Sequence, residues 1–134
     1  MSESDLNLLV RYRLDQAQEA LQDARLLHGA GRSSLSVVNR SYYAMFYAVL
    51  ALLQRISKVP RKHAEAISLF DGEYVKKKIF TREDSKDLHR VFELRQVSDY
   101  QVIEPVTREE TIEALAKADR FVKVVTAYLS AAGT

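Results

Sequence analysis

The sequence of 134 residues contains no cysteine and no tryptophan, and it has only four glycines and two prolines. Without cysteine the chain can form no disulfide framework, no thiolate zinc site and no cysteine nucleophile. So few glycines and prolines leave little turn chemistry for many short strands, which argues against an all-β sandwich or barrel. Walker, GxGxxG, GxSxG and HExxH patterns are also missing, so we expect no metal site and no cofactor.

Long apolar runs and a strong charge of one sign are absent as well. No stretch approaches the roughly 20 apolar residues of a membrane span, and the first ten residues lack the pattern of a signal peptide. We therefore expect a cytoplasmic protein without membrane contact. The net charge of +2 is too small to indicate a nucleic-acid binder. Its mildly basic segment, residues 55–90, is interpreted as solvated surface.

What the sequence does contain is helical periodicity. Hydrophobic residues make up 47% and charged residues 28%, the balance of one globular domain over residues 1–134. Apolar residues recur every three or four positions, which predicts long helices near 4–28, 33–57, 83–102 and 107–131 and a shorter one near 61–70. Ser33 or Ser34 can cap the second helix, and Thr107 with Glu110 forms a capping box for the last. Short connections predict an all-α, up-and-down antiparallel bundle. The segment 73–80 is left open between a short helix and a loop.

The helix near 83–102 places two opposite charges in its apolar stripe. One arc of about 100° collects the following residues: Leu88, Val91, Phe92, Arg95, Asp99 and Val102. Arg95 and Asp99 are one turn apart on the side that should pack inward, where an unpaired charge costs several kcal/mol. The pair either fastens the bundle or lines a cleft or subunit seam, where arginine can hold a phosphate with two hydrogen bonds.

The second helix carries a polar arc beside its apolar stripe, which itself includes Tyr42. The polar positions are Ser36, Asn39, Arg40, Tyr43, Tyr47 and Gln54. Tyrosines beside an arginine and an asparagine can stack on a base and hold phosphate oxygens. Alternatively, the tyrosines pack between helices with satisfied hydroxyls. Lys62 and His63 stand at the start of the short helix, where His63 is expected at the surface or facing a phosphate.

Two of these segments together resemble the HEPN superfamily of small helical domains. They are Asn39–Phe46 (NRSYYAMF) and Leu94–Tyr100 (LRQVSDY), supported by Lys62-His63 and more weakly by Phe70 and Tyr74-Val75. The resemblance covers about residues 13–129. It implies a bundle of four or five helices that forms a homodimer and works with a nucleotidyltransferase in a toxin–antitoxin module. Many members of the superfamily are metal-independent RNA endonucleases.

The resemblance also implies a set of site residues. The endonuclease signature is an arginine followed, after four to six residues, by a histidine; Arg95 matches, but Tyr100, Gln101 and Val102 occupy the histidine positions. Arg95 would hold phosphate, Asp99 would orient it, and Tyr100 could stack, donate a hydrogen bond or accept a modification. The residues expected to bind RNA or a nucleotide are Asn39, Arg40, Tyr43, Tyr47, Lys62 and His63.

Three functions follow from these residues. The leading hypothesis is a HEPN-type homodimer that binds RNA or a nucleotide and works with a nucleotidyltransferase. The second is an active metal-independent endoribonuclease centred on Arg95, with an acid–base other than histidine. A tyrosine with an unperturbed pKa near 10 is a poor base, and an arginine-paired aspartate is a weak one. The third is a structural interaction module in which Arg95 and Asp99 fasten a seam.

Overall fold

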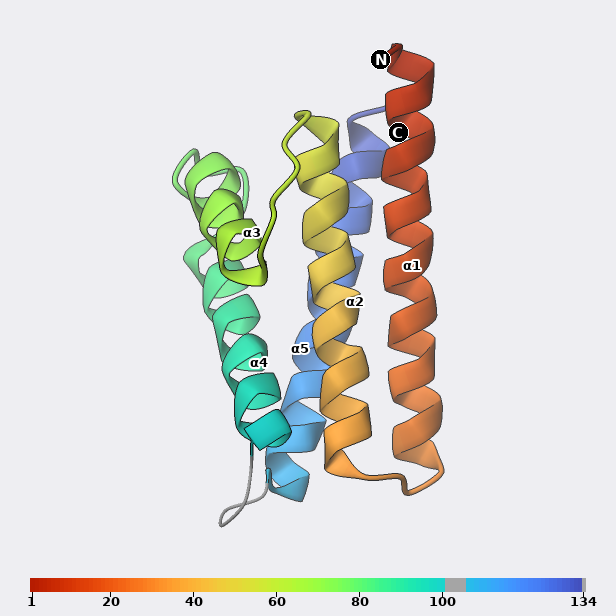
Figure 1. Ribbon diagram of the computed structural model, residues 1–134, viewed down its shortest axis with the longest axis vertical. Helices are drawn as coiled ribbons and strands as arrows, with labels where there is room; N and C mark the ends of the chain where they lie inside the picture. The colour runs from red at the N-terminus through yellow and green to blue at the C-terminus, as the bar shows by residue number, and fades with distance from the viewer. Residues whose placement is uncertain (101–105, 134) are drawn as a thin grey trace.

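The computed structural model describes residues 1–100 and 106–133, with the side chains of residues 99 and 100 left out. The elements are α1 (Glu3–Gly29), α2 (Ser34–Arg55), α3 (His63–Phe70), the π-helical turn η1 (Asp71–Val75), α4 (Arg82–Tyr100) and α5 (Arg108–Ala131). The described residues contain no strand. Successive long helices run in opposite directions (Figure 1), which confirms the predicted all-α up-and-down bundle. None of the described helices is long and apolar enough to cross a membrane.

Helix α2 is the centre of the bundle. It packs against α1, α3, α4 and α5, so it buries residues around much of its circumference. Each large apolar side chain withdrawn from water in this way contributes about 1.5–3 kcal/mol. Most apolar side chains in the middle of α2 are buried, whereas Leu35 near its start and Ile56 just after its end are 42% and 40% exposed.

Two predicted helix caps are present. The Ser33 hydroxyl accepts a hydrogen bond from the backbone N–H of Ser36 at 3.2 Å, at the start of α2. At the start of α5, Thr107 and Glu110 exchange side-chain-to-backbone hydrogen bonds of 3.0 and 3.1 Å. Both arrangements satisfy N–H groups that the first helical turn leaves without partners.

Residues 73–80, for which the sequence allows either a short helix or a loop, begin within a π-helical turn and then become irregular. The Lys76 N–H donates to the carbonyl of Asp71, five residues earlier, at 2.8 Å. This wider turn lets Tyr74 face inward, where its hydroxyl donates to the carbonyl of Leu52 at 2.5 Å. The carboxylate of Asp71 also contacts α4, 2.7 Å from the Ser85 hydroxyl and 2.7 Å from His89 Nε2. The turn therefore joins the end of α3 to both α2 and α4.

Candidate functional site

Arg95 points from α4 toward α2, on the inward face that helical periodicity predicts. Its guanidinium carbon lies 5.3 Å from the centroid of the Tyr42 ring and 5.6 Å from that of Tyr43. The arginine is half-buried, so these contacts are partly shielded from water. Cation–π contacts of this kind are worth about 0.5–2 kcal/mol. The fold thus holds a positive charge against two tyrosine rings.

His63 joins the same group of side chains from α3. Its Nδ1 lies 2.7 Å from the Tyr42 hydroxyl oxygen. Its ring stacks on Phe46, with centroids 4.2 Å apart and planes 8° apart, and meets Tyr43 edge to face at 5.7 Å. His63 is half-buried among aromatic rings. We call Tyr42, Tyr43, Phe46, His63 and Arg95 the aromatic–cation cluster.

Burial fixes the protonation states in this cluster. Burial raises the pKa of Tyr42 well above its usual range, although the charge of Arg95 acts in the opposite direction. The hydroxyl therefore stays protonated. Burial, together with the positive charge of Arg95, lowers the pKa of His63 below 6.5. The imidazole is neutral at pH 7, so one ring nitrogen carries a proton and the other has a lone pair.

The neutral imidazole of His63, in contact with the protonated Tyr42 hydroxyl, can adopt either of two tautomers. If Nδ1–H donates to the Tyr42 oxygen, Nε2 keeps a lone pair that can accept a proton. If the hydroxyl donates to Nδ1 instead, Nε2–H can donate a hydrogen bond to a phosphate oxygen. In both forms Tyr42 orients His63 beside Arg95. The cluster can therefore combine an anion-binding group with a proton-transfer group.

The polar positions of α2 are only partly brought to this cluster. The guanidinium carbon of Arg40 lies 5.2 Å from the Tyr43 centroid, and its Nε donates to Asn39 Oδ1 at 3.3 Å. Tyr47 contacts the Tyr43 ring with centroids 5.8 Å apart. Arg40 and Tyr47 also line a shallow pocket against α1, beside Asp23. Arg40, Tyr47 and Arg95 thus gather around the Tyr43 ring, while Asn39 contacts Arg40.

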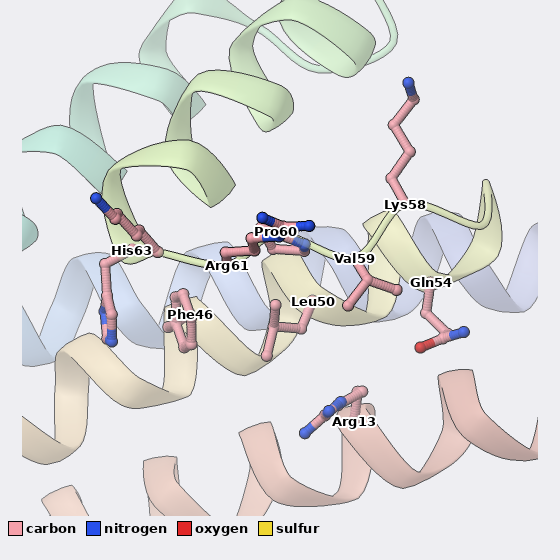
Figure 2. Close-up of a pocket in the computed structure, with 10 residues that line it drawn as sticks. Arg13, Phe46, Leu50, Gln54, Lys58, Val59, Pro60, Arg61 and His63 are labelled. Carbon is pink, nitrogen blue, oxygen red and sulfur yellow. The ribbon is translucent and has the colours of Figure 1, made fainter.

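Lys62 directly precedes His63 in the chain. It is exposed and stands just before α3, without a side-chain capping bond. It lines a pocket whose wall also includes Phe46 and His63 (Figure 2). This pocket therefore shares two residues with the aromatic–cation cluster.

The predicted roles of Asp99 and Tyr100 concern side chains outside the described ones. The Arg95–Asp99 ion pair accordingly stays a prediction, as does a contact of Tyr100 with a ligand. Within the described part of the chain, no group of three or more histidine and acidic side chains could hold a metal ion. His89 instead contacts Asp71.

Sequence periodicity did not predict that Tyr42 and Phe46 contact His63. Tyr42 was assigned to the apolar stripe, and it is indeed fully buried, but its hydroxyl contacts His63. A usable signal was present, because a buried tyrosine hydroxyl normally finds a hydrogen-bond partner. Phe92 of α4 also packs against the Tyr42 ring, with centroids 5.5 Å apart.

Comparison with known proteins places this arrangement in a family. A model of the HEPN domain matches residues 10–128, a range that contains the whole aromatic–cation cluster. A UPF0332 protein of Thermotoga maritima is 34% identical over 87% of this chain and 88% of its own length. A UPF0332 protein of Gloeobacter violaceus is 30% identical over 87% of this chain and 93% of its own. A protein of Methanocaldococcus jannaschii named "Putative toxin" is 28% identical over 87% of this chain and 78% of its own. The chain thus belongs to the HEPN domain family.

Proposed function

We propose that this protein binds RNA or a nucleotide at the aromatic–cation cluster. The observation that carries the proposal is the position of Arg95 over the rings of Tyr42 and Tyr43, beside the imidazole of His63. A guanidinium can hold two phosphate oxygens at once. The half-buried rings of Tyr43 and Phe46 next to it can stack on a base without reading its identity.

The proposal extends to the assembly in which the protein works. The family resemblance supports a homodimer that acts with a nucleotidyltransferase in a toxin–antitoxin module. Two relatives from Methanocaldococcus jannaschii are named "Putative toxin", which supports the same setting. In this setting the RNA-binding cluster is the part that acts on the target, and the partner controls it.

The binding proposal is tested by replacing Arg95 and a matched arginine of the same helix. Arg95→Gln should lower the affinity for a fluorescent 12-nucleotide RNA at least about tenfold, because hydrogen bonds to charged groups are worth about 1.5–3 kcal/mol. Arg90→Gln is the control, since Arg90 contacts Glu93, Glu110 and Glu113 rather than the tyrosines. It should leave the affinity within about twofold. Equal affinities of wild type and a folded Arg95→Gln variant would contradict the proposal.

A second candidate function, metal-independent RNA cleavage, is favoured by the position of His63. The sequence offers no histidine after Arg95 on α4, but the fold brings an imidazole to Arg95 from α3. His63 would accept the proton of a ribose 2′-hydroxyl, whose oxygen then attacks the adjacent phosphorus. The 5′-oxygen would leave with a proton from water, which yields a 2′,3′-cyclic phosphate and a 5′-hydroxyl. Arg95 would hold the phosphate oxygens during this step.

The cleavage candidate is tested with purified protein, RNA and EDTA. Wild type should cleave, and both His63→Gln and Arg95→Gln should lose at least about 100-fold in rate, the usual contribution of general acid–base catalysis. His89→Gln, which changes a histidine outside the cluster, should retain the rate. Intact RNA after incubation with wild type would refute cleavage and leave binding as the function of the cluster.

A further inference from the structure

The end of α2 and the start of α3 enclose a pocket next to the aromatic–cation cluster. The chain turns sharply after α2, where Ser57 has a φ of 59° and the Lys58 N–H donates to the carbonyl of Leu53 at 2.9 Å. The connection then runs back beside α2 to reach α3 (Figure 1). A cavity of about 260 Å³ lies between this connection, α2 and α1. We call it the basic pocket; its lining residues used below are Arg13, Phe46, Leu50, Val59, Pro60 and Arg61.

The charge of the basic pocket is positive. Arg13 lies on its α1 side and Arg61 on the side of the connection, with Leu50 of α2 between them (Figure 2). No lining residue is acidic. Arg13 hydrogen-bonds a neutral group, Gln16 Oε1, at 2.9 Å. Among the described residues, neither Arg13 nor Arg61 forms a salt bridge, although seven other lysines and arginines do.

The walls between these two arginines are apolar. Phe46 and Leu50 come from α2, and Val59 and Pro60 come from the connection. Val59 is 77% exposed, so its side chain is accessible to a ligand in the pocket. Apolar walls flanked by arginines suit the flat face of a base and the phosphates on either side of it. The cavity is slightly smaller than the roughly 300 Å³ at which pockets for whole small molecules begin. It therefore fits one nucleotide better than a dinucleotide cofactor.

The basic pocket continues directly into the aromatic–cation cluster. Phe46 and His63 belong to both, and their rings stack on each other. A ligand with one phosphate at Arg95 can therefore place its next units along Phe46 into the basic pocket. A polyanionic strand uses both sites at once, whereas a free mononucleotide fills only one of them.

We propose that the basic pocket is a second nucleotide subsite, which binds a neighbouring residue of the same single-stranded RNA that the aromatic–cation cluster holds. This rests on the proposed function and narrows its ligand to a strand. Arg13 and Arg61 bind the backbone phosphates, and the walls formed by Phe46, Leu50 and Pro60 receive the base.

The experiment compares Arg13→Gln, Arg61→Gln and the double variant with Arg11→Gln. Arg11 is two positions from Arg13 on α1 but lines a pocket against Thr126 and Ser130 of α5, so it controls for loss of charge alone. The double variant should bind a fluorescent 12-nucleotide oligouridylate at least about tenfold more weakly. Its log-affinity slope against log salt should be shallower by about 1.4, because two phosphates of a single strand count about 0.7 each. Arg11→Gln should bind as wild type does.

Ligands of two lengths distinguish the contribution of the basic pocket from that of the aromatic–cation cluster. For uridine monophosphate, which is too short to bridge the two sites, the double variant should lose less affinity than it does for the 12-nucleotide RNA, while Arg95→Gln should still bind more weakly than wild type. If the double variant matches wild type on the 12-nucleotide RNA while Arg95→Gln is weakened, the basic pocket is refuted and the proposed function stands. If wild type binds no RNA of either length, both are refuted.

Discussion

Two arginines of α4, five positions apart, have opposite surroundings. Arg90 faces α5, where its guanidinium contacts Glu93 at 3.2 Å, Glu110 at 3.2 Å and Glu113 at 3.1 Å. Its hydrogen bonds with Glu113 raise its pKa above the usual range. Arg95 faces α2, where it lies over two tyrosine rings. One helix therefore carries one arginine that contacts three carboxylates and another that lies against two aromatic rings.

The contrast extends from these arginines to the two sides of α4. Toward α5, ion pairs repeat along the contact: Lys117 with Asp87 at 2.9 Å and Arg120 with Asp84 at 2.8 Å. Toward α2 and α3, aromatic rings and His63 take the place of carboxylates among the described side chains. The α4–α5 contact is built to hold helices together. The α2–α3–α4 contact is built to keep a cation and an imidazole next to each other, which is what a ligand can use.

The largest loss of stability is expected from a substitution on the α4–α5 side of the bundle. Asp84 accepts a hydrogen bond from the Thr81 N–H at 2.9 Å, donates its own N–H to the Thr81 hydroxyl at 3.1 Å, and pairs with Arg120. Asp84→Ala should lower the free energy of unfolding by about 1–3 kcal/mol, because a helix cap and a largely buried ion-pair partner are lost together. Urea denaturation measures this loss. The neighbouring exposed carboxylate provides the control: Glu83→Ala should stay within about 0.5 kcal/mol of wild type.

A smaller effect is expected on the aromatic side. Tyr42→Phe removes only the hydroxyl that contacts His63, which should lower the free energy of unfolding by about 0.5–1.5 kcal/mol. It should also weaken RNA binding, since His63 loses the group that orients it. Tyr128→Phe is the matched control, because Tyr128 of α5 lies outside the cluster and makes ring contacts but no side-chain hydrogen bond among the described residues. A Tyr42→Phe variant as stable as wild type and equal to it in RNA binding would remove the reason for treating Tyr42 as part of the site.

The smallest expected effect is the pH dependence of the free energy of unfolding that protonation of His63 causes. In the folded protein its pKa is lowered below 6.5, so in acid the unfolded chain binds a proton before the folded one. The contribution is complete above pH 6.5, falls as the pH drops below that value, and levels off below the folded pKa. His63→Gln should remove this part of the decline. Urea denaturation of both proteins between pH 7.5 and about 5 tests it, and parallel curves would show that His63 titrates alike in both states.

Much of the fold follows from local patterns in the sequence. The apolar spacing located all four long helices, and the serine and threonine caps marked the starts of two of them, because these signals depend only on neighbours along the chain. The π-helical turn Asp71–Val75 was missed. Its register is set by contacts of Asp71 with α4 and of Tyr74 with α2, and periodicity does not contain such contacts.

From periodicity alone, the candidate site was predictable only where it coincides with a helical face. Arg95 faces inward because its place in the stripe of α4 requires it. The contact between Tyr42 and His63 joins residues 21 positions apart on different helices, so one sequence without its fold cannot reveal it. The same holds for the basic pocket, which Arg13 and Arg61 both line only because the connection after α2 turns back on itself.

The central position of α2 has a consequence for the timing of synthesis. Every residue of the aromatic–cation cluster precedes α5 in the chain, yet both α2 and α4 bury apolar side chains against α5. A nascent chain that ends before α5 contains Tyr42, His63 and Arg95 but lacks the surface that holds their helices together. We therefore expect the cluster to become stable only after α5 has left the ribosome and docked.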